Sequence, residues 1–137
     1  MSTGITVADE VVGVFNDFKL KRTDKKYLVL TIQGDQVALT SSYGKDVSHE
    51  DFCAKYLTDS PCYVCLDFDY ETTDGRPSDK IILISWIPDT ARVREKMKFA
   101  GTKEAVKSAL QGIGLNINAT DKSECTKDIL ISECNKI

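Results

Sequence analysis

Near the start of the chain, apolar residues recur at the spacing of an α-helix. They lie three or four positions apart, so that in a helix they share one face. The pattern predicts a helix of about three turns from near Val7 to Lys19. Thr6 followed by Asp9 resembles a capping box at its start. The apolar positions are Val7, Val11, Val14, Phe15 and Phe18.

Two β-rich segments follow this helix. YLVLTIQ, residues 27–33, and QVALTSS, residues 36–42, are separated by Gly34 and Asp35, which favour a tight turn. We therefore predict an antiparallel hairpin. In SHEDFCAKY, residues 48–56, a serine with an acidic residue three positions later predicts the start of a short helix.

The middle of the chain contains two stronger strand signals. In CYVCLDFDY, residues 62–70, apolar side chains alternate with a set that includes Asp67 and Asp69, which predicts one buried and one partly polar face. We expect these two carboxylates to form salt bridges or to be solvated. After a turn, IILISWI, residues 81–87, is apolar at nearly every position, which indicates a strand inside the sheet and covered on both faces.

A long helix is expected after this inner strand. Pro88 ends the strand because it has no N–H, and Asp89 or Thr90 is the candidate N-cap of a helix that runs to about Leu110. A short strand in LNINA, residues 115–119, and a last helix within residues 127–137 complete the order of elements. This order predicts one α/β (α+β) domain over residues 1–137, in which helices flank a mixed sheet.

Composition excludes several classes of function. The 137 residues carry a net charge of −3, whereas nucleic-acid binding needs a broad basic surface. The N-terminus has no signal-peptide pattern, and no apolar run approaches the ~18 residues of a membrane span. We therefore expect a cytosolic protein with no transmembrane segment and no nucleic-acid partner.

Cysteine usage suggests buried thiols. An odd number of cysteines without an export signal argues against a disulfide framework. Cys62 and Cys65 have CxxC spacing but lie in an apolar, β-rich segment. A small thiol enzyme centred on this pair is the alternative, and it requires a thiolate of low pKa. We predict no metal site and interpret His49 as a surface residue. The cysteines are Cys53, Cys62, Cys65, Cys125 and Cys134.

Positive charge is concentrated on the predicted long helix. Residues 91–110 contain six cations and two acids, so this segment has a net charge of +4 and the rest of the chain −7. Cations in the first turn oppose the helix macrodipole, so stability does not require them. An acidic protein partner accounts for them, with Met97 as an apolar anchor on a stripe with Val93 and Ala100. The cations are Arg92, Arg94, Lys96, Lys98, Lys103 and Lys107.

Sequence motifs along the whole chain resemble those of the actin-depolymerising factor (ADF)/cofilin family. WIPDTARVREKM, residues 86–97, and FAGTKEAVKSALQGI, residues 99–113, are similar to the long-helix signature of that family. The N-terminus of the family resembles residues 1–20, and its third strand resembles CYVCLDFDY. The segment before its last helix resembles INATDKSE, residues 117–124. The resemblance implies an ADF-homology domain, with a mixed sheet of five or six strands and helices on both faces.

The resemblance also implies where actin binds. The monomer site would comprise the N-terminal residues and the long helix, and a weaker filament site would comprise the loop before the fourth strand and the last helix. Arg92 replaces a proline common in the family and could reach phosphoinositides together with Lys96 and Lys98. Ser2 and Thr3 precede Gly4, as the regulatory phosphorylation site of the family does. The implied monomer-site residues are Ser2, Thr3, Gly4, Ile5, Arg94, Lys96 and Met97, and the filament-site residues are Arg76, Lys80, Glu133 and Lys136.

As a function, the resemblance implies a non-enzymatic, cofactor-free monomer of the cytoplasm and cytoskeleton. It would bind actin monomers (G-actin), preferring the ADP form, and filaments (F-actin), and would promote severing and depolymerisation. The filament-side surface would be weak because its loop and last helix carry few net positive charges. The alternative within the same fold is a coactosin-like or glia-maturation-factor-like protein, which binds filaments or a branch-nucleating complex but no monomers.

Overall fold

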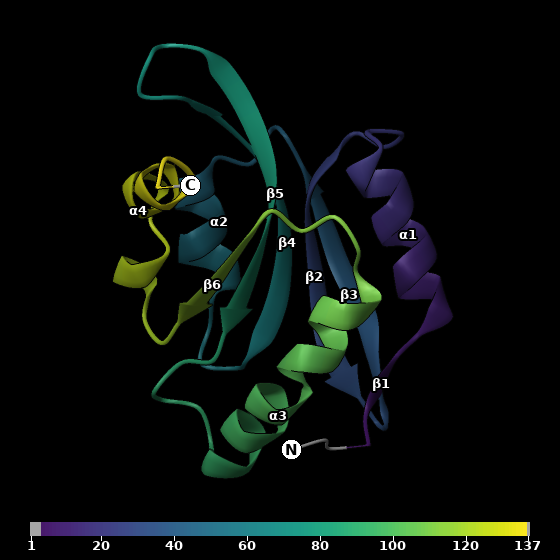
Figure 1. Ribbon diagram of the computed structural model, residues 1–137. Coiled ribbons are helices and arrows are strands. Elements are labelled where there is room, and N and C mark those ends of the chain that lie inside the picture. Colours follow the sequence, from purple (N-terminus) through teal and green to yellow (C-terminus); the bar gives the residue numbers. More distant parts are fainter. Residues whose placement is uncertain (1–3, 137) are drawn as a thin grey trace.

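A six-stranded mixed sheet with helices on both faces forms the centre of the computed structural model, which describes residues 4–136 (Figure 1). The strand order is β1-β3-β2-β4-β5-β6. The inner pairs are antiparallel, whereas β1 pairs with β3 and β6 with β5 in parallel. The predicted fold class is therefore confirmed. The strands are β1 (Thr6–Val7), β2 (Lys25–Gln33), β3 (Gln36–Gly44), β4 (Cys62–Glu71), β5 (Pro77–Trp86) and β6 (Leu115–Ala119).

Helices cover the two faces of the sheet in pairs. Apolar side chains of α1 and α3 pack on one face and those of α2 and α4 on the other, so that two separate cores form. Burial on both faces accounts for the nearly continuous apolar sequence of β5 between Ile81 and Trp86. This confirms β5 as an inner strand. The helices are α1 (Asp9–Lys19), α2 (His49–Tyr56), α3 (Val93–Ala109) and α4 (Lys127–Cys134), with a short 3₁₀ helix η1 (Lys122–Glu124) before α4.

The starts of α1 and α3 differ from the sequence prediction. Ala8 is the N-cap of α1 and has no side-chain capping bond, so the predicted Thr6 capping box is wrong. The amide of Thr6 instead donates to the Asp35 carbonyl (3.1 Å), which places β1 in the sheet. Arg92 is the N-cap of α3, and the hydroxyl of Thr90 donates to Asp59 (2.8 Å). Thr6 and Thr90, which the local sequence pattern assigned to helix capping, therefore bond instead to residues distant in the sequence.

An ion-pair cluster connects the end of α1 to the central strands. The Lys21 ammonium lies 2.7 Å from the buried carboxylate of Asp67 and 2.9 Å from Asp79. Lys21 adopts a left-handed backbone conformation (φ 60°), which turns the chain after α1. The expected salt bridge of Asp67 is confirmed, and Asp69 is exposed.

We expect Lys21→Met to lower the free energy of unfolding by about 1–2 kcal/mol, because it leaves the Asp67 carboxylate buried without its counter-charge. The loss stays below that of a fully buried pair because Lys21 is half-exposed and screened by water. Hydrogen bonds to Asp67 and Asp79 raise the pKa of Lys21, so this contribution is complete at neutral pH and declines only in strongly alkaline solution. The coupling free energy between Lys21 and Asp67 is measured by urea unfolding of Lys21→Met, Asp67→Asn and the double variant. Additive losses of stability in the double variant would contradict this ion-pair contribution.

Candidate functional site

The first half of α3 presents an apolar strip to solvent. Val93 and Met97 are one helical turn apart and are 68% and 69% exposed. The buried positions of α3 are instead Phe99, Thr102 and Val106, which face the sheet. The predicted apolar stripe of Val93, Met97 and Ala100 is exposed at all three residues and is not the face that packs on the sheet. Large apolar side chains that fold stability does not require are candidates for binding.

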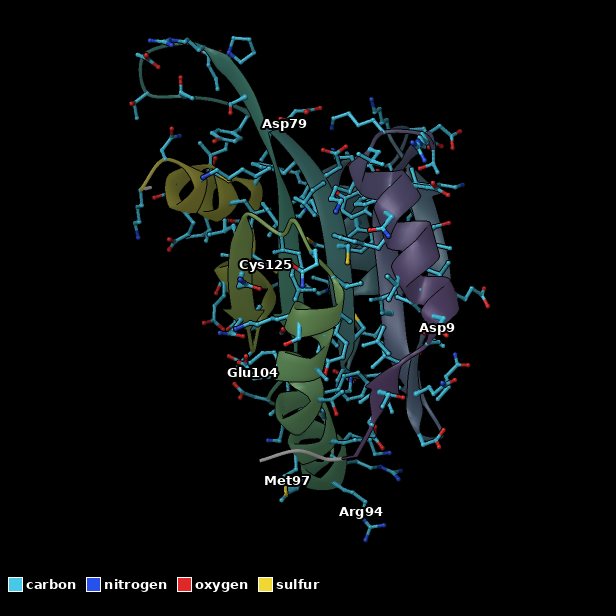
Figure 2. All side chains as sticks on the ribbon, turned by 45° about the vertical axis from the view of Figure 1, so that its right-hand side comes forward. Asp9, Asp79, Arg94, Met97, Glu104 and Cys125 are labelled. Atoms are coloured by element: carbon cyan, nitrogen blue, oxygen red, sulfur yellow. The ribbon has the colours of Figure 1, made fainter. Side chains whose placement is uncertain are left out.

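Two cations flank this strip. At about 100° of rotation per residue, Arg94 lies on one side of Met97 and Lys96 on the other. Figure 2 shows Arg94 and Met97 at the same end of α3, with their side chains directed away from the sheet. We call Val93, Arg94, Lys96 and Met97 the α3 binding surface.

The charges of the α3 binding surface are not neutralised within the described part of the chain. Among residues 4–136, Arg94 and Lys96 form no ion pair, and the Lys96 ammonium donates only to the Asp89 carbonyl (3.4 Å). Lys98, by contrast, lies 3.7 Å from Glu95 on the opposite flank from Lys96. Lys98 is therefore paired with an acid, whereas the phosphoinositide contact of Arg92, Lys96 and Lys98 stays a prediction.

The N-terminal segment lies on the same side of the sheet as α3. Ile5 is partly buried against the core that α1 and α3 share, and Gly4 is exposed with φ 77°. β1 contacts α3 directly (Figure 1). Ser2 and Thr3 lie outside the described residues. The described part of the predicted monomer site therefore comes from two segments on one side of the molecule.

The predicted filament-site residues gather on the β4–β5 hairpin and α4. Lys80 donates to the carbonyl of Cys134 (3.1 Å), which joins β5 to the end of α4. Two of the four side chains are paired with acids: Arg76 lies 3.0 Å from Asp74, and Lys136 lies 3.1 Å from Glu133. This hairpin end lies far from the start of α3, as the labels of Asp79 and Arg94 in Figure 2 show.

Cys62 and Cys65 do not have the thiol chemistry that the enzyme alternative requires. Both are buried in β4, and burial raises the pKa of each thiol to about 12. A nucleophilic thiolate at neutral pH needs the opposite shift. The interpretation of these two residues as ordinary buried thiols fits this environment.

His49 is not at the surface, as the sequence suggested, but buried at the start of α2. Its Nδ1 lies 2.9 Å from the hydroxyl of Tyr27, and its Nε2 lies 2.7 Å from the carbonyl of Cys125. Both partners are distant in sequence, so the local polar pattern of residues 48–51 could not indicate this burial.

One group of described acidic residues has metal-ligand spacing. Carboxylate oxygens of Asp67, Asp69 and Asp79 lie within 4.8 Å of one another. The Lys21 ammonium already contacts Asp67 and Asp79, so a cationic side chain neutralises this cluster. We therefore assign it a structural role.

Comparison with known proteins identifies the family. The profile of "Cofilin/tropomyosin-type actin-binding protein" matches residues 4–135. "Actin-depolymerizing factor 7" of Arabidopsis thaliana is 35% identical over 131 residues, with 96% of this chain and 95% of the relative covered. "Actophorin" of Entamoeba histolytica is 35% identical over 136 residues, with coverages of 98% and 97%. The chain therefore belongs to the cofilin/ADF family and is an actin-binding protein of the depolymerising-factor type.

Solved structures agree with this assignment. A cofilin of Streptomyces griseoflavus superimposes with a TM-score of 0.87 at 27% identity, covering 97% of this chain and 98% of the other. Human coactosin-like protein has the same fold with a TM-score of 0.76 but is 18% identical, covering 99% of this chain and 92% of the other. At that identity the likeness concerns the fold alone.

Among residues 4–136, no helix is both long and apolar enough to cross a bilayer.

Proposed function

We propose that this chain binds ADP-actin monomers through the α3 binding surface together with residues 2–5. The observation that carries the proposal is the exposure of Met97 and Val93 between two cations that have no acidic partner among residues 4–136. Binding an acidic actin surface relieves the mutual repulsion of these cations, and burial of Met97 supplies the apolar contribution. The N-terminal residues extend the contact because Ile5 packs on the same core as α3.

Filament binding uses the second surface, formed by Arg76, Lys80, Glu133 and Lys136. Internal pairing leaves little net positive charge there, so we expect its contribution to be weaker than that of the α3 binding surface. The two surfaces lie at opposite ends of the molecule and can contact two subunits at once. A ligand that prefers the ADP-bound or twisted filament shifts the filament towards that state, which promotes severing and subunit loss.

The protein acts without covalent chemistry, cofactor or metal. Its function is differential binding in the cytoplasm and cytoskeleton, and we propose that it acts as a monomer. Phosphorylation of Ser2 or Thr3 would place a charge of about −1.5 to −2 beside the actin contact and oppose binding to an acidic surface. A phosphoinositide contact would rest on Arg92 and Lys96, since Lys98 is paired with Glu95.

Disassembly of pyrene-labelled filaments and binding to fluorescent ADP-actin and ATP-actin monomers test this function. We expect the native protein to shorten filaments, to accelerate their loss and to bind ADP-actin more tightly than ATP-actin. A coactosin-like or glia-maturation-factor-like protein would not bind monomers. Filament binding without any monomer binding would therefore overturn the proposal, and tight saturable filament decoration would overturn the weak second surface.

A further inference from the structure

A cavity with a thiol in its wall lies on the face of the sheet that α2 and α4 cover, away from α3. It has a volume of about 830 Å³, and its lining includes Cys53, His49 and Lys122. Cys53 lines the cavity and is 9% exposed, whereas Cys125 is fully buried. A small reagent that enters the cavity therefore meets the sulfur of Cys53 before that of Cys125.

Two donors converge on the sulfur of Cys53. The thiol of Cys125 lies close enough to influence it and is also 3.8 Å from the carbonyl oxygen of Lys122, and Nε2 of His49 lies 3.4 Å from the Cys53 sulfur. Because Nε2 also faces the carbonyl oxygen of Cys125 at 2.7 Å, and a carbonyl only accepts, this nitrogen carries a proton in either charge state of the ring. The Tyr27 hydroxyl at Nδ1 fixes the ring in this orientation.

This arrangement divides the two thiols into a thiolate and a proton donor. The Cys125 hydrogen bond lowers the pKa of Cys53, and the proton on His49 lowers it further, against the effect of burial. The same contact raises the pKa of Cys125 well above that of a free thiol. Such an environment characterises reactive cysteines rather than inert buried ones.

We propose that Cys53 and Cys125 form a peroxide-sensitive thiol pair, with Cys53 as the attacking thiol and Cys125 as the resolving thiol. The oxidant is a hydroperoxide small enough to enter the cavity. The pair joins α2 to the end of η1, two elements that are 72 residues apart in sequence but held together by the His49 contact.

The reaction balances in two steps. The Cys53 thiolate attacks one peroxide oxygen, an S–O bond forms, the O–O bond breaks, and the leaving oxygen takes a proton to become water or an alcohol. Sulfur is oxidised by two electrons and the peroxide is reduced by two. The sulfur of Cys125 then attacks the sulfenic acid at Cys53, the S–S bond forms, the S–O bond breaks, and hydroxide leaves with the Cys125 proton as water.

Limited treatment of the full-length folded protein with hydrogen peroxide at pH 7, followed by alkylation and non-reducing peptide mass spectrometry, tests the pair. We expect one disulfide, between Cys53 and Cys125, and an intact mass lower by two hydrogen atoms. Cys53 should react roughly tenfold or more faster than Cys65, whose buried thiol stays protonated.

Matched variants separate the two roles. Cys125→Ser should accumulate sulfenic acid at Cys53, trapped by dimedone, whereas Cys53→Ser should leave Cys125 reduced. Cys62→Ser, which removes a buried thiol from β4, should still form the disulfide. Circular dichroism checks that each variant is folded. Oxidation of Cys53 no faster than that of Cys65, or a disulfide between any other pair, would overturn the proposal, and actin binding does not enter either readout.

Discussion

Arg94→Glu combined with Lys96→Glu should weaken binding to ADP-actin monomers by about a hundredfold, or about 3 kcal/mol. The two cations flank the exposed Met97, so their reversal places like charges against an acidic actin surface. The loss should shrink as salt is raised, since exposed charges are screened over about 8 Å at physiological ionic strength. A fluorescence titration at two salt concentrations measures both effects.

The same variant should not be less stable than the native protein. Residues 94 and 96 lie in the first turns of α3, where acidic side chains interact favourably with the macrodipole by about 0.3–1 kcal/mol each. Lys103→Glu with Lys107→Glu is the matched control, with an equal charge change in the second half of the same helix. Because residue 107 is in the last turn, this control should lose stability and keep actin affinity. Equal loss of affinity in both variants would show that net charge alone governs binding.

Elements with a strong hydrophobic period could be predicted well from the sequence. The nearly continuous apolar run of β5 is a direct consequence of its position between two helical layers. The prediction of one buried and one partly polar face for β4 is wrong between Cys62 and Phe68, where both faces are buried, because helices cover this strand on both sides as well. The starts of α1 and α3 could not be predicted, because Thr6 and Thr90 bond to Asp35 and Asp59, which are 29 and 31 residues away. A local capping rule has no information about such partners.

The binding face of α3 shows a second limit of prediction from the sequence. Its sequence contains two candidate faces, one through Val93 and Met97 and one through Phe99 and Val106. The second face includes Thr102, whose polarity argues against burial, yet its hydroxyl donates to the Lys98 carbonyl (2.8 Å) and is thereby satisfied. The charge pattern and the family resemblance both indicated Met97 as a contact residue, but periodicity alone could not decide which of the two faces packs on the sheet.

The thiol pair could not be read from the sequence at all. Cys53 and Cys125 belong to no short motif, and the spacing that does resemble one, Cys62 and Cys65, places two inert thiols in β4. Only the packing of α2 against the segment after β6 brings His49 and Cys125 together. Contacts of this kind depend on strand order, which periodicity does not determine.

Phe99→Ala should lower the free energy of unfolding by about 3–4 kcal/mol, the usual cost of truncating a buried aromatic side chain. Phe99 is 3% exposed and packs on Tyr63 with ring centroids 5.2 Å apart, so it attaches α3 to β4. The Tyr63 hydroxyl also donates to the backbone carbonyl of Phe99. The substitution keeps this acceptor but removes the ring that positions Tyr63. Urea unfolding followed by circular dichroism measures the loss.

Met97→Ala, two residues away, should give the opposite result. Its side chain is 69% exposed, so the free energy of unfolding should change by less than about 0.5 kcal/mol. Affinity for ADP-actin should nevertheless fall by about tenfold or more, because Met97 is the apolar anchor of the α3 binding surface. Folded Phe99→Ala protein at low temperature should keep most of its affinity, since the α3 binding surface is unchanged. If instead Met97→Ala unfolded readily and bound actin normally, Met97 would be a core residue and the α3 binding surface would have to be reassigned.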